Sequence, residues 1–151
     1  MTALPIPTKE SIEALAGYQF PGGEYRIAHW ENFLLTECTG ATLMPDGMAH
    51  PIALFHLPIT GAGTSIAGMF ELGQAESDLS IMIESYDWEF FAPLREEFNY
   101  GVTGQITSSQ RCRDDSGNTY DRIQFCFEVF TTDKAMVARS IITWHYTRNT
   151  L

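Results

Sequence analysis

Two histidines stand near the start of an uncharged stretch that runs from Gly47 to Phe70. A neutral imidazole accepts a proton near physiological pH, so His50 is a candidate general base. The alternative is a structural histidine that hydrogen-bonds within a loop. His56 lies one and a half helical turns further along and is either a satisfied core histidine or a ligand contact. The sequence therefore offers His50 for proton transfer and His56 for binding.

No pattern indicates a metal ion or a bound cofactor. Neither an HxxxH spacing nor a pair of CxxC motifs occurs. Gly61-Ala62-Gly63 lacks the preceding strand and the third glycine of a nucleotide-binding loop, so we interpret it as a helix-packing feature. His145 and Asp121 fall on predicted strands, and their spacing does not establish that they meet. We expect no metal and no cofactor.

The uncharged stretch predicts a buried helix from Pro51 to Leu72. A helix without a polar stripe has to be covered on every side, either by a sheet or by lipid. Two histidines, several glycines and acidic flanks argue against lipid, so we expect a helix wrapped by sheet. Unbroken, this helix is about 30 Å long. Pro58 is expected to kink it or to delay its start.

Four extended segments follow the predicted helix, and they alternate apolar with polar residues. The turns at 114–118 and 132–134 connect them into an antiparallel meander. These segments span residues 79–91, 98–111, 120–130 and 136–146. The sheet therefore accounts for most of the second half of the chain.

The first half predicts smaller elements. Residues 1–16 are expected to form a loosely ordered arm with one helical turn near Ser11, and residues 17–27 a short strand or hairpin. Residues 28–38 predict a helix whose apolar face is directed at the core, and residues 41–49 form a loop. The residues of that apolar face are Trp30, Phe33, Leu34 and Cys38. We read residues 1–151 as a single α+β domain.

Composition narrows the classes of partner and location. A net charge of −10 repels nucleic acid and anionic membranes, so we expect neither as a partner. Only 19% of the residues are charged, which suggests that part of the surface is covered by another protein chain. The three cysteines form no CxxC pair, and no signal-peptide pattern opens the sequence, so we expect a reducing, cytoplasmic location.

Three segments carry a resemblance to a known family. They are the run from Trp88 to Leu94 that leads into 98–104, the strand 121–127, and the segment 142–148 that ends in Trp-x-Tyr-x-Arg. With the order of elements, they resemble the hot dog fold of the MaoC-like hydratases and dehydratases. The likeness is greatest to the amino-terminal domain type of fungal-type fatty acid synthase dehydratases and of mycobacterial heteromeric dehydratases, over about residues 18–148.

The resemblance implies a curled antiparallel sheet wrapped around one long central helix. The main rival is a cone-shaped α+β fold of the scytalone dehydratase type, which encloses its pocket within one chain. The resemblance also implies a dimer, either of identical chains or with a related hot dog subunit, that binds acyl-CoA or acyl-ACP thioesters between its chains.

The catalytic loop of that family is degenerate here. Active members carry Gly-Asp-x-Asn-Pro-x-His after the small helix, whereas residues 39–44 read Thr-Gly-Ala-Thr-Leu-Met, with Ala41 at the aspartate position. Pro51 matches the proline that begins the family's central helix. The glycine whose N–H polarises the thioester carbonyl falls near Phe55, whose side chain restricts that approach.

Two functional hypotheses follow from the resemblance. In the first, the chain is a thioester-binding partner or non-catalytic subunit of a 3-hydroxyacyl-thioester dehydratase or enoyl hydratase. Asn32, Pro51, Phe55 and His56 are then the expected substrate-binding residues. In the second, it is a divergent enoyl-CoA hydratase, a hydro-lyase, with His50 or Glu37 as base. Glu37 is on the small helix that borders the family's pocket, where it either replaces the lost carboxylate or is solvated.

Overall fold

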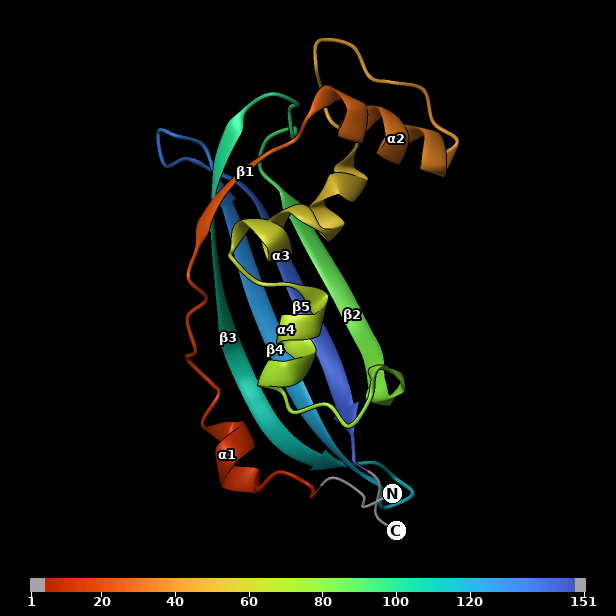
Figure 1. Ribbon diagram of the computed structural model, residues 1–151, viewed down its shortest axis with the longest axis vertical. Helices are drawn as coiled ribbons and strands as arrows, with labels where there is room; N and C mark the ends of the chain where they lie inside the picture. Colours follow the sequence, from red (N-terminus) through yellow and green to blue (C-terminus); the bar gives the residue numbers. More distant parts are fainter. Residues whose placement is uncertain (1–4, 149–151) are drawn as a thin grey trace.

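The computed structural model describes residues 5–148, and Figure 1 shows a five-stranded antiparallel sheet with the helical segments packed on one face. The strand order is β1-β3-β4-β5-β2. The strands are β1 (Gly23–Arg26), β2 (Ile81–Phe90), β3 (Asn99–Arg113), β4 (Thr119–Phe130) and β5 (Met136–Thr147). The helical segments are α1 (Lys9–Glu13), α2 (His29–Thr39), η1 (Pro51–Phe55), α3 (Leu57–Gly61), α4 (Ile66–Leu72) and η2 (Asp78–Ser80).

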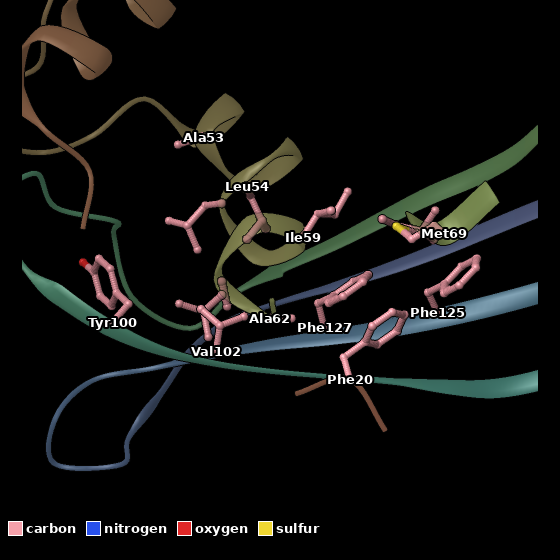
Figure 2. Packing of buried hydrophobic residues seen from close by; sticks show 14 of the residues in the cluster. Phe20, Ala53, Leu54, Ile59, Ala62, Met69, Tyr100, Val102, Phe125 and Phe127 are labelled. Atoms are coloured by element: carbon pink, nitrogen blue, oxygen red, sulfur yellow. The ribbon is translucent and has the colours of Figure 1, made fainter. Parts of the chain in front are cut away.

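The predicted α+β class and the antiparallel meander are confirmed. Side chains alternate between the two faces of a strand, so every second residue of β4 points to the helices. Those residues are Ile123, Phe125, Phe127 and Val129, and none of them is exposed. Figure 2 shows Phe125 and Phe127 packed beside Phe20, which reaches the same layer from the segment before β1.

The central segment is helical but does not form one long helix. It consists of η1, α3 and α4, with Pro58 in the first turn of α3 and Gly63 in a left-handed conformation (φ 82°) after it. Ser65 then caps the start of α4 by accepting a bond from the N–H of Gly68 at 2.9 Å. The predicted helix from Pro51 to Leu72 is therefore divided into three pieces: the interruption at Pro58 was expected, whereas the one at the positive-φ Gly63 was not.

The glycines of this segment also set how closely it approaches the sheet. A Cβ on Gly61 would lie 2.6 Å from Cγ2 of Val102 on β3, so no larger residue fits there without a shift. Figure 2 shows Ala62 and Val102 in contact range at this point of the core. The expectation that Gly61-Ala62-Gly63 serves packing agrees with this contact.

The amino-terminal segment differs from the expected loose arm. Helix α1 lies against β3, where the hydroxyl of Ser109 donates to the carbonyl oxygen of Ile12 at 2.7 Å. The side chain of Ile12 is fully buried. Of the arm predicted over residues 1–16, positions 1–4 lie outside the described residues. The remainder is held to the sheet because an apolar side chain and a backbone carbonyl are both satisfied there.

A buried ion cluster joins distant parts of the chain. Asp121 on β4 is fully buried and accepts two bonds from Arg111 on β3, at 2.7 and 2.9 Å, and one from Arg148 at 2.7 Å. Arg148 also donates to the carbonyl oxygens of Gly73 and Gln74 at the end of α4. The cluster therefore connects the sheet to the last turn of the central segment.

Removing the carboxylate of Asp121 should destabilise the folded protein. We expect Asp121→Asn to lower the free energy of unfolding by about 3–5 kcal/mol, because the buried guanidinium of Arg148 and the partly buried one of Arg111 would lose their counter-charge. Urea unfolding followed by circular dichroism measures this. The matched control is Glu13→Gln, which breaks an exposed 3.9 Å pair with Lys9 and should cost less than about 0.5 kcal/mol. Equal losses in the two variants would contradict the assigned role.

Candidate functional site

The predicted site residues gather where α2, the loop 41–50 and η1 meet. Asn32 on α2 is the centre of this junction and is buried. Its side-chain nitrogen donates to the carbonyl oxygen of Met48 (3.2 Å) and to Glu96 (2.9 Å), and its side-chain oxygen accepts from the N–H of His50 (2.9 Å). The bond from Asn32 is the main cause that lowers the pKa of Glu96. Asn32 was predicted to bind substrate, but its amide is fully used in holding the loop.

His50 caps the start of η1. Its ring atom Nδ1 accepts a hydrogen bond from the N–H of Ile52 at 3.0 Å, and Nε2 lies 3.4 Å from the hydroxyl of Thr39. A neutral imidazole whose Nδ1 accepts a bond carries its proton on Nε2. Neither nitrogen is then free to remove a proton from a substrate. This geometry favours the structural alternative for His50.

Glu37 and Ala41 also lie away from any acid–base arrangement. Glu37 is exposed on α2, and within the described residues it has no hydrogen bond to His50. Ala41 is exposed in the loop, where its N–H is bound by the carbonyl oxygen of Thr36 at 3.3 Å. Neither Glu37 nor Ala41 therefore supplies an acid–base partner to His50.

A second polar cluster joins three elements. His56, between η1 and α3, places Nε2 2.5 Å from a carboxylate oxygen of Glu31 on α2. The hydroxyl of Tyr25 on β1 donates to the same oxygen at 2.5 Å. Burial, and then the Glu31 carboxylate, raise the pKa of Tyr25, so its hydroxyl stays protonated and donates.

The hydrogen bond to Glu31 fixes which nitrogen of the His56 imidazole is the donor. Because the carboxylate of Glu31 accepts, Nε2 of His56 is the donor, and Nδ1 has no hydrogen bond among the described residues. The side chain of His56 is 34% exposed. His56 was predicted, whereas Tyr25 and Glu31 were missed. The only sequence signal for Glu31 was its place three residues after Ala28, at the start of a helix.

The apolar face of α2 points away from the core. Trp30 is 66% exposed, Phe33 44% and Leu34 53%, and Cys38 is exposed as well. The buried residues of this helix are instead Asn32 and Thr36. The prediction that the apolar face packs on the chain's own core is therefore wrong, because the hydrogen bonds of Asn32 hold the opposite face inward. Exposed apolar surface of this extent is typical of an interaction site.

An apolar groove of about 450 Å³ lies beside η1. Its walls are two methionines of the loop, Met44 and Met48, together with Pro51 and the segment 90–94 after β2. Phe55, predicted to contact substrate, is 44% exposed and stacks on Tyr86 of β2 with ring centroids 5.4 Å apart. Pro51 thus lines a groove, whereas Phe55 covers the neighbouring strand.

Two buried donors lie on the inner face of the sheet, on the neighbouring strands β2 and β5. The indole N–H of Trp88 on β2 and the hydroxyl of Ser140 on β5 have no hydrogen-bond partner among the described residues. The two residues are opposite each other in the β2–β5 pairing. Buried donors are nearly always satisfied in folded proteins, so an acceptor from outside residues 5–148 is expected here.

The remaining candidates do not form a site together. Asp121 points to the core, whereas His145 is on the outer face, where it binds Glu84 at 2.9 Å and stacks on Tyr120. Between residues 5 and 148, no three His, Cys, Asp or Glu side chains are grouped to hold a metal ion. Within the same range, no helix combines the length and the hydropathy needed to cross a membrane.

Solved structures match this architecture at low sequence identity. The HadBC complex (3R-hydroxyacyl-ACP dehydratase) of Mycobacterium tuberculosis aligns over 87% of this chain and 96% of that one, with a TM-score of 0.66 and 11% identity. The ChsH1–ChsH2 complex of the same organism covers 93% and 90%, with a TM-score of 0.65 and 9% identity. The chain has the hot dog fold.

A third hot dog match is the monoamine oxidase regulatory protein of Archaeoglobus fulgidus, with a TM-score of 0.65, 11% identity, and coverage of 99% and 100%. The sequence matches no protein-family model and no curated protein. The predicted likeness to the MaoC-like group is therefore confirmed for the fold, and the matches favour the hot dog architecture over the cone-shaped alternative.

The role of Asn32 in holding the loop 41–50 is testable. We expect Asn32→Ala to lower the free energy of unfolding by about 1–3 kcal/mol, because the Met48 carbonyl and the His50 N–H lose their bonds to Asn32 and Glu96 keeps only His29. Urea unfolding measures the loss, and limited proteolysis should show faster cleavage within 41–49. Glu37→Ala, on the exposed face of the same helix, should change stability by less than about 0.5 kcal/mol. An Asn32→Ala protein as stable as this control would show that the junction is not held as described.

Proposed function

We propose that this chain is an acyl-thioester-binding hot dog subunit that works together with a second hot dog chain. The observation that carries the proposal is the uncovered apolar surface on two elements, the outer face of α2 and the inner side of β2. Trp30, Leu34 and Ile83 are each more than half exposed there. A second chain that packs on this surface would bury it.

Two features support a thioester as the ligand. The groove beside Pro51 is lined almost entirely by apolar atoms, which suits an acyl chain. The indole N–H of Trp88 and the hydroxyl of Ser140 find no acceptor in the described part of the chain, and a thioester carbonyl or an amide of its carrier arm supplies one. Among the structural matches, HadBC is described as an acyl-ACP dehydratase. The free state of all three cysteines agrees with a cytoplasmic location for such a subunit.

The catalytic groups are proposed to come from the second chain. Ala41 has no ionisable group, His50 is committed to capping η1, and Glu37 is exposed. The break into η1, α3 and α4 also leaves few aligned peptide dipoles to polarise a carbonyl at the start of the central segment. The partner subunit should therefore carry the complete Gly-Asp-x-Asn-Pro-x-His loop, and a neighbouring reading frame that encodes it would support this role.

Binding without turnover is the expected result for the isolated chain. Isothermal titration with acyl-CoA of increasing chain length should show binding, and crotonyl-CoA and longer enoyl-CoA should not be hydrated. Met48→Glu places a carboxylate in the groove and should weaken binding at least about tenfold. Leu79→Glu is the control, since Leu79 is 93% exposed and away from the groove. Absence of binding at every chain length would contradict the thioester role.

One observation favours a second candidate, a divergent enoyl-thioester hydratase. Glu31 holds Nε2 of His56 as a donor, so Nδ1 is the nitrogen that can accept a proton. This pair, rather than His50 or Glu37, is the acid–base group that the fold supplies.

If the purified chain hydrates enoyl-CoA, His56→Gln should lower kcat by about 10²–10⁴-fold, because the proton acceptor would be removed. His50→Asn is the matched control, because asparagine preserves the N-cap, and its turnover should be unchanged. Turnover that survives in His56→Gln but is lost in His50→Asn would rule out the His56–Glu31 pair as the base.

A further inference from the structure

We propose that the edge strand β2 selects a non-identical partner, a hot dog chain whose own edge strand carries basic residues on its outer face. The inference rests on the proposed assembly with a second hot dog chain and specifies the chemistry of that chain. It follows from three properties of β2: an unpaired edge, an apolar inner side and an acidic outer side.

Strand β2 has a free edge along its whole length. It lies at the end of the sheet, and among residues 5–148 it pairs with β5 alone (Figure 1). The ten-residue strand Ile81–Phe90 therefore presents unpaired backbone donors and acceptors on its outer edge. An exposed edge of this kind accepts a strand from another chain.

The inner side of β2 is apolar and only partly covered. Ile83 is 64% exposed and Phe90 41% exposed, and Tyr86 and Trp88 lie between them on the same side. Phe55 stacks on Tyr86, so this surface continues toward η1 and α2. The apolar side supplies affinity for a partner but does not distinguish one partner from another.

The other side of the strand is acidic. Glu84, Asp87 and Glu89 are the charged residues of β2, and the strand contains no lysine or arginine. Glu84 is neutralised by Arg122 at 2.7 Å, with His145 beside it. That contact, chiefly with Arg122, lowers the pKa of Glu84 to about 2.

The other two carboxylates have weaker partners. Glu89 lies 3.7 Å from Arg139, which it shares with Glu128 at 3.2 Å. Within residues 5–148, the one hydrogen-bond partner of Asp87 is the hydroxyl of Ser85, at 3.3 Å. Because one arginine serves both Glu89 and Glu128, and no described cation pairs with Asp87, the outer side of this edge carries a net negative charge centred on Asp87 and Glu89.

A second copy of this chain is a poor partner for such an edge. In a two-fold dimer the same strand meets itself, so antiparallel pairing places the carboxylates of one β2 against those of the other. Like charges opposite each other destabilise a strand pair, and each copy also carries a net charge of −10. A strand with lysine or arginine at the facing outer positions would instead form cross-strand ion pairs.

A charge-reversal experiment tests this without the natural partner. The variant Asp87→Lys/Glu89→Lys imitates a basic edge. Sedimentation velocity is run on the wild type, the variant and their equimolar mixture, without thioester. The mixture should associate at least about tenfold more tightly than the wild type alone. Its advantage should shrink between about 0.05 and about 0.5 M salt, as screening increases.

The control is Asp115→Lys/Asp133→Lys, which changes the net charge equally but in two exposed hairpin turns. A mixture of this control with the wild type should associate no more tightly than the smaller net charge alone explains. Circular dichroism confirms that each variant is folded. The proposal is overturned if the wild type self-associates as tightly as the mixture, if the control mixture gains as much, or if no sample associates. Loss of thioester binding together with a tight mixture would reject the proposed ligand and leave this inference intact.

Discussion

The buried carboxylate of Asp121 is the constraint that holds α4 and the amino-terminal segment against the sheet. It holds Arg111 on β3 and Arg148 after β5, and through them the carbonyl oxygens of Pro7, Gly73 and Gln74. An arginine is tolerated inside a protein only when its charge and its N–H groups are matched. The three side chains therefore keep α4 and the amino-terminal segment on one end of the sheet, which leaves the other end to form the site.

The sheet was predictable from the sequence, whereas the central segment was only partly so. Alternation of apolar and polar residues is a local signal with period two, and the predicted ranges for β2 to β5 match the observed strands within a few residues. The break at Pro58 was expected from the sequence, whereas the one at Gly63 belongs to a positive-φ glycine that lies against Pro21 and Gly22. Those contacts join residues far apart in the chain, so no local pattern reveals them.

The junction of α2 shows why the site was harder to predict than the fold. An apolar stripe on a helix predicts a buried face, but it does not say which chain buries it. Here Asn32 fixes the opposite face through three hydrogen bonds, and Trp30 and Leu34 remain exposed. In the same way, Tyr25, Glu31 and His56 come from three separate elements, and only the packed structure brings them to one point.

In the proposed recognition of a partner, the exposed apolar side chains supply affinity, whereas the carboxylates of β2 supply specificity. Burial of Trp30, Ile83 and Phe90 is favourable against almost any apolar surface, so it does not select a partner by itself. The carboxylates of Asp87 and Glu89 contribute little attraction in water, yet they penalise an acidic partner at the same edge. Under the proposed assembly, residues 39–44 carry no aspartate or histidine, so the acid–base groups come from the second subunit and these two surfaces serve to bind it. The specificity of that binding then resides in the edge strand rather than in a catalytic residue.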